Sequence, residues 1–320
     1  MPKGKTIKPS MTKPSAPPEA GAGRRALLHL CGGIAFVSVL TLAVVTARRY
    51  VDQHVAAPVG PLKVVLLNKP AWMSEFLAQQ IAATVPRAAS SAFDHELLVV
   101  AADKLRQNPW VRDVHSVRRE YGERPGDTLA VDCEFRAPIA LVQWGDYYWL
   151  VDGDGMKLPE QFTASHVPRI VLGRNGRMNV RIIEGVKQPP PVSGQRWAGA
   201  DLSAGLGLVK LLYGRSYAEE LVTVNVANFG GRKDAREAQL VLRTKYGTEV
   251  RWGRPLDAKD FFAEVPVSQK LDSLKSVVEQ YGRVDAGQPW IDIRYDRITY
   301  PKPAGALGGD GAAARIDAGH

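Results

Sequence analysis

The sequence predicts an α+β protein in which a single transmembrane helix precedes two domains that combine strands and helices. The first observation is an uncharged apolar segment of 22 residues, 26–47. The second is the order strand, helix, helix, strand, strand over residues 62–137. The third is a series of short strands with two or more helices over residues 138–300. Strands and helices in this order predict the α+β class.

The apolar segment predicts a membrane span. As a helix, Ala26–Ala47 would cover about 33 Å, enough for the ~30 Å hydrocarbon core of a bilayer. Six basic residues and one acidic residue precede it, and only Arg48 and Arg49 directly follow, so the positive charge predicts a cytoplasmic N-terminus. A cleaved signal peptide ending at Val45-Thr46-Ala47 is the alternative, but such peptides have shorter apolar segments.

The net charge of +9 has a local origin. After residue 49 the chain holds 34 basic and 32 acidic residues, so the excess lies in the N-terminal tail and beside the span. This distribution argues against a nucleic-acid-binding ectodomain. Residues 1–25 have almost no large apolar side chains and are predicted to be a disordered cytoplasmic tail. Residues 48–61 are predicted to be a connector, and residues 301–320 a second disordered tail.

The first domain is predicted to begin with a buried strand at 63–68. A helix follows, whose apolar face is Met73, Phe76, Leu77, Gln80 and Ile81. A second helix has Asp94 as its N-cap and a hydrophobic staple of Phe93 and Leu98. Its apolar face is Leu98, Ala101, Ala102 and Leu105. Strands at 115–121 and 128–135 complete the domain, and the second alternates cleanly between apolar and polar residues.

Several segments of this region resemble the POTRA domain of the bacterial cell-division family FtsQ/DivIB. They are Asn108-Pro109-Trp110-Val111, Val117-Arg118-Arg119, Asp127-Thr128-Leu129 and Arg136-Ala137-Pro138-Ile139-Ala140-Leu141. Further along, Trp149–Gly155 resembles the family's "LVD-x-x-G" hairpin. The helix segment Lys270-Leu271-x-x-Leu274 and the strand Trp290–Tyr295 resemble the end of its β-domain.

The resemblance covers roughly residues 24–300. It implies a POTRA domain at 62–137 and an FtsQ-type β-domain at 138–300. The motif residues that it assigns mainly to structure are Asn108, Pro109, Trp110, Val111, Arg136, Pro138, Asp152 and Gly155.

In the second domain, the local patterns predict strands at 139–144, 147–151, 170–172, 221–227, 239–244, 249–252 and 290–300. A helix at 202–213 has Asp201 as its cap, and the clearest helix, 267–281, ends at Gly282. Residues 173–200 are rich in Gly and Pro and are predicted to be a loop or insertion.

No catalytic arrangement is found in the sequence. The six histidines do not pair at helical ligand spacing, and no HExxH, GxSxG, P-loop or Cys-x-x-Cys motif occurs. Asp152-Gly153-Asp154-Gly155 could suggest a calcium loop, but the twelfth position of such a loop is Thr163 instead of an acid. The sequence therefore predicts a protein that is not an enzyme and has no metal or cofactor.

The resemblance implies partners instead of chemistry. In the family, the C-terminal region receives segments of the single-span proteins FtsB and FtsL. Arg294 and Tyr295 align with the motif that carries contacts, and Ile298 and Tyr300 match less specifically. Ile291 and Ile293 alternate with polar residues and are predicted to lie in the core.

Together with the predicted span, the resemblance implies a bitopic division protein in the cytoplasmic membrane at the septum, whose extracytoplasmic domains assemble partners that regulate septal peptidoglycan synthesis. Two other classes stay open. A POTRA-bearing transport or outer-membrane assembly module would have tandem POTRA repeats or a C-terminal barrel. A membrane-anchored cell-wall enzyme would use the 173–200 segment.

Overall fold

The computed structural model describes residues 22–54, 62–88, 94–120, 127–172, 180–258 and 264–301. The chain forms two compact units. The first contains the N-terminal helix, together with Ala88–Asp94 and Arg119–Thr128. The second contains Lys63–Arg87, His95–Arg118 and the residues from Leu129 onward.

Helix α1, Ala22–His54, contains the predicted span 26–47. Its segment His29–Val51 has 23 residues and a mean hydropathy of 2.2, so it is long and apolar enough to cross a membrane. None of this segment is buried in the structure. The hydroxyl groups of Thr41 and Thr46 each donate to the carbonyl four residues earlier at 2.7 Å, which satisfies these polar groups within the helix.

The order strand, helix, helix, strand, strand is confirmed for the first part of the chain. Its elements are β1 (Lys63–Leu66), α2 (Glu75–Ala83), α3 (His95–Arg106), β2 (Val111–Glu120) and β3 (Thr128–Phe135). The three strands form one sheet in the order β1-β3-β2, with β3 in the centre. Leu129, Val131 and Cys133 on the predicted apolar face of β3 are all buried, and so is Ala130 on the other face.

Two predicted helix faces differ from those observed. Met73 and Ile81 of the first predicted face are buried, but Phe76 is 69% exposed, and Ala78 and Ala82 of α2 are buried although they were not predicted to be. Helix α3 buries Leu97 with Ala101 and Leu105, which shifts the predicted face by one residue at its start. In each helix, further apolar residues lie beside the predicted face, so the sequence pattern did not determine which side is buried. Phe93 of the predicted staple lies outside the described residues.

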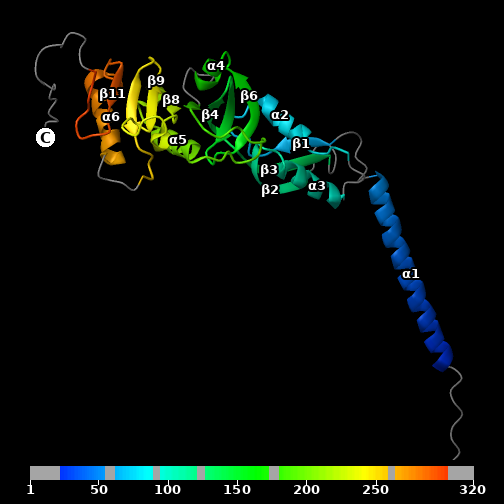
Figure 1. Cartoon of the computed structure of the whole chain (residues 1–320). Coiled ribbons are helices and arrows are strands. Elements are labelled where there is room, and N and C mark those ends of the chain that lie inside the picture. The colour runs from blue at the N-terminus through cyan, green and yellow to red at the C-terminus, as the bar shows by residue number, and fades with distance from the viewer. Residues whose placement is uncertain are drawn as a thin grey trace, which may run out of the picture. The chain divides into compact units, whose positions relative to one another are not determined.

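The rest of the second unit is built on an eight-stranded mixed sheet. Its strands are β4 (Pro138–Trp144), β5 (Tyr147–Asp152), β6 (Lys157–Thr163), β7 (Arg181–Glu184), β8 (Leu221–Asn225), β9 (Leu240–Thr244), β10 (Glu249–Gly253) and β11 (Trp290–Asp292). They lie in the order β11-β10-β9-β8-β7-β4-β5-β6, and the two outermost strands are β11 and β6 (Figure 1). The predicted boundary between residues 137 and 138 falls where the chain passes from one sheet to the other.

Helices α5 (Ala200–Leu212) and α6 (Val267–Tyr281) pack on this sheet and share one hydrophobic core with it. Gly282 ends α6 in the left-handed conformation with φ 71°, as predicted. The predicted cap of α5 is wrong by two positions, because Gly199 is the N-cap and Asp201 lies in the first turn. Two short 3-10 helices, Ala218–Glu220 and Phe229–Gly231, flank β8.

Residues 173–200, predicted to be a loop or insertion, contain β7. This strand pairs in parallel with β4 on one side and β8 on the other, so it is internal to the sheet. It has four residues between Gly- and Pro-rich stretches, and nothing local reveals its two partners. The strand predicted at 170–172 is also wrong: Val167–Leu172 is helix α4, with Pro168 in its first turn.

Candidate partner-binding edge

The edge of the eight-stranded sheet nearest the C-terminus consists of β11 and a following segment that pairs with it through a single bridge. Strand β11 pairs in parallel with β10, with Val250 opposite Ile291. On its outer side, Asp292 and Thr299 exchange two backbone hydrogen bonds, with N···O distances of 2.9 and 3.1 Å. The predicted continuous strand 290–300 is therefore β11 followed by a turn and a single bridge.

This bridge determines which backbone groups face outward. In an antiparallel pair, a residue that exchanges both bonds with its partner is flanked by residues whose N–H and C=O groups point away from that partner. Thr299 is such a residue, so the backbone groups of Ile298 and Tyr300 are directed away from β11. The edge can accept an added strand at these two residues.

The predicted contact residues divide into three kinds. Tyr295 is 46% exposed and its ring is available to a partner. Ile298 and Tyr300 are half-buried and pack against the core beneath the edge. Burial raises the pKa of Tyr300, whose side chain also hydrogen bonds to Tyr281. Ile291 and Ile293 are fully buried, which confirms their prediction as core residues.

Arg294 differs from the other predicted contact residues, because it is only 7% exposed and its side chain binds groups within the protein. Its Nη2 donates to Asp292 Oδ2 at 2.7 Å and its Nε to Asp292 Oδ1 at 3.0 Å. Its Nη1 donates to the Arg236 carbonyl at 2.9 Å. These bonds with Asp292 raise the pKa of Arg294. The prediction of Arg294 as a contact residue on the edge is not supported by this geometry, since its donors are occupied inside the protein.

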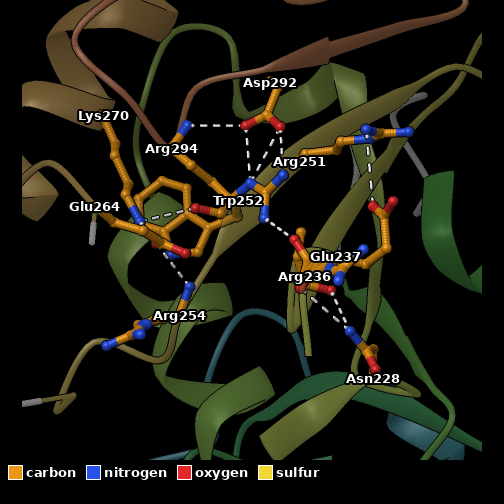
Figure 2. A network of polar contacts seen from close by, with 11 residues as sticks. Asn228, Arg236, Glu237, Arg251, Trp252, Arg254, Glu264, Lys270, Asp292 and Arg294 are labelled. Atoms are coloured by element: carbon orange, nitrogen blue, oxygen red, sulfur yellow. Dashed lines mark hydrogen bonds and ion pairs between the residues drawn. The ribbon is translucent and has the colours of Figure 1, made fainter. Parts of the chain in front are cut away.

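A second buried ion pair lies beside the first (Figure 2). Lys270, on α6, is 3% exposed, and its Nζ donates to Glu264 Oε2 at 2.6 Å and to the Trp252 carbonyl at 2.8 Å. Burial lowers the pKa of Lys270, and the hydrogen bond to Glu264 opposes that shift. Glu264 also accepts from the Arg254 backbone N–H at 2.9 Å. The pair fixes the segment before α6 against β10.

The motif residues assigned to structure meet where the two sheets adjoin. The Asn108 side chain accepts from the backbone N–H of Trp110, and the Trp110 carbonyl accepts from Arg136 N at 2.9 Å. Arg136 Nη1 donates to Asp152 Oδ2 at 2.8 Å. Pro138 lies opposite Asp152 in the pairing of β4 with β5. Three motif residues remain. Val111 is buried, and Pro109 lies next to Gly194. Gly155 has a positive φ of 80° in the turn that follows β5.

One contact at this junction has no signal in the sequence. Trp110 Nε1 donates to Glu160 Oε1 at 3.2 Å, and Glu160 Oε2 is buried without a hydrogen-bond partner among the described residues. Burial raises the pKa of Glu160, and the bond from Trp110 opposes that shift. Glu160 lies on β6, a strand that was not predicted. This strand contains Pro159, a residue type that is rare within strands.

The acidic turn at 152–155 is organised by hydrogen bonds. Asp152 Oδ1 accepts from the backbone N–H groups of Asp154 and Met156, both at 2.8 Å, while Oδ2 binds Arg136. Within the described ranges, no group of three or more His, Cys, Asp or Glu side chains is placed to hold a metal ion.

We compared the chain with protein-family models and with curated proteins, and neither comparison finds a match. The FtsQ/DivIB resemblance therefore depends on the motifs alone and remains a prediction.

Proposed function

We propose that this protein is a non-catalytic, bitopic scaffold of bacterial cell division. In this proposal α1 spans the cytoplasmic membrane, the N-terminus is cytoplasmic, and the two sheets lie outside the membrane at the division septum. The scaffold binds FtsB-like and FtsL-like single-span proteins and so helps to regulate septal peptidoglycan synthesis. The observation that carries it is the C-terminal edge, together with the motifs that resemble the FtsQ/DivIB family.

The edge supports a partner of a particular form. The backbone groups of Ile298 and Tyr300 face away from β11, and they suit an extended segment that adds a strand by main-chain hydrogen bonds. The exposed ring of Tyr295 lies three residues from Ile298 and offers a side-chain contact beside that strand. Aromatic side chains of this kind are enriched among residues that dominate binding energy.

The N-terminal helix supports the proposed location. An edge of this type can pair with any exposed strand, so a scaffold needs a device that limits which partners it meets. The 23-residue segment of α1 that is long and apolar enough to cross a membrane would anchor this chain in the same membrane as its single-span partners. Co-anchoring raises the effective concentration of two weakly interacting segments.

Localisation of the full-length protein tests the proposal. A fluorescent tag on the full chain should concentrate at midcell in dividing cells and disperse in cells that are not dividing. An unrelated single-span protein with the same tag serves as the control and should stain the envelope uniformly. Uniform staining by the full-length protein as well would overturn the proposed role in division.

A further inference from the structure

Three chain segments that are distant in sequence meet at Arg294. Its guanidinium binds Asp292 of β11 and the Arg236 carbonyl of the β8–β9 loop. Its own carbonyl accepts from Val265 N, just before α6, at 2.8 Å. Figure 2 shows the guanidinium between the carboxylate of Asp292 and the backbone of Arg236. The residue thus connects the last strand with two loops.

The β8–β9 loop is ordered independently by Asn228, which is 9% exposed. Its Nδ2 donates to the carbonyls of Asp234 and Ala238 at 2.8 and 3.2 Å. Its Oδ1 accepts from the backbone N–H groups of Lys233 and Asp234 at 2.8 and 3.0 Å. One side chain therefore fixes both ends of this loop, so the Arg236 carbonyl occupies a defined position.

Asp292 joins this loop to the outer edge. Its carboxylate binds Arg294, while its backbone N–H and C=O pair with Thr299. Any displacement of Asp292 would therefore move the bridge that orients Ile298 and Tyr300. The path from the β8–β9 loop to the edge consists of two residues, Arg294 and Asp292.

We propose that Arg294 is a positioning residue for the partner-binding edge, and that it couples the order of the β8–β9 loop to the order of residues 298–300. This inference rests on the proposed function, because it concerns the same edge. Arg294 then supports the edge without contacting the partner. Partner binding would order residues 228–239 as well as the edge itself.

The chemistry of the site requires arginine. The guanidinium donates through Nε and Nη2 to one carboxylate and through Nη1 to a carbonyl on its other side. A lysine ammonium is a point charge on a flexible stem and cannot reproduce this fixed fork. Arg294→Lys keeps the charge but should lose the connection to Arg236. Arg297→Lys is the matched control, since Arg297 is exposed three residues away.

Hydrogen exchange in the full-length protein without a partner tests the coupling. Arg294→Lys should speed exchange in peptides covering 228–239 and 292–300 together, by about tenfold, the change expected from losing one charge-assisted hydrogen bond. Asn228→Ser, which touches only the loop, should also speed exchange at 292–300. The inference is wrong if Arg294→Lys speeds exchange at 292–300 alone, or if Asn228→Ser speeds exchange at 228–239 alone. It is also wrong if Arg297→Lys gives the same result as Arg294→Lys.

Recovery of a co-expressed, full-length FtsB-like protein from the same cells separates this inference from the proposed function. Arg294→Lys should reduce recovery by about tenfold or more, and Arg297→Lys should leave it unchanged. If the wild-type protein recovers no partner, the proposed function fails. If the wild type and Arg294→Lys recover the partner equally, only the positioning role fails.

Discussion

Lys270→Met should be strongly destabilising, because it leaves two buried acceptors without their donor. In the wild-type protein, Nζ donates to Glu264 and to the Trp252 carbonyl, and the Lys270 and Glu264 side chains are 4% and 11% exposed. Removing one partner of a buried ion pair typically costs about 3–5 kcal/mol. Glu264 retains its bond from Arg254 N, so we expect a loss of about 2–4 kcal/mol in the free energy of unfolding.

Thermal unfolding of the full-length protein in detergent, followed by tryptophan fluorescence, measures this loss. All seven tryptophans lie at or after Trp72, so the signal reports on the second unit. The expected loss corresponds to a decrease of roughly 4–16 °C in the unfolding temperature. Met is similar in volume to the lysine stem and is a good helix former, which isolates the effect of the charge.

The matched control is Lys275→Met on the same helix. Lys275 and Glu279 are 68% and 65% exposed, and their closest N–O distance is 3.7 Å. An exposed pair of this kind contributes about 0–1 kcal/mol. Adding Glu264→Gln to Lys270→Met should recover part of the loss by removing the uncompensated charge. Equal unfolding temperatures for the two single variants would show that the buried ion pair contributes no more to stability than the exposed one.

Two further variants test packing and charge in the second unit. The raised pKa of Glu160 means that the folded protein binds this proton more tightly than the unfolded chain, so the stability it contributes is lost as pH rises through that pKa. Glu160→Gln should therefore stabilise the protein more at pH 7 than at pH 5; a constant difference in unfolding temperature would contradict this. A Cβ at Gly185 would lie 2.6 Å from the Ala227 backbone, whereas Gly247, also at positive φ, has open space around it. Gly185→Ala should lower the unfolding temperature more than Gly247→Ala, and equal decreases would exclude the predicted overlap.

Much of the fold could be predicted because its signals are local. Helix α6 has an apolar periodicity and a glycine that stops it, and both lie within 16 residues, 267–282. In β3, apolar and polar residues alternate in sequence, and the apolar residues Leu129, Val131 and Cys133 are buried. The order of elements between residues 63 and 135 follows from such patterns alone. Each of these features depends on neighbours in sequence.

The features that could not be predicted depend on distant residues. Strand β7 is defined by β4 and β8, which lie about 40 residues before and after it. Arg294 was predicted to be a contact residue because it aligns with the family motif that carries contacts. Its burial depends on the Arg236 carbonyl, 58 residues away. The spacing Asp292-x-Arg294 was the local signal, since an acidic and a basic side chain two residues apart can form an ion pair, as these two do.

If the C-terminal edge binds a partner, variants of the edge should recover less of that partner. Full-length Tyr295→Glu and Ile298→Glu would be compared with Tyr213→Glu, which alters a tyrosine that is 75% exposed elsewhere on the chain. FtsB-like and FtsL-like proteins recovered from the same membranes would be quantified. Each edge variant should recover at least about tenfold less of the partner, and the control should recover as much as the wild type. Unchanged recovery by both edge variants would show that this edge does not bind the partner.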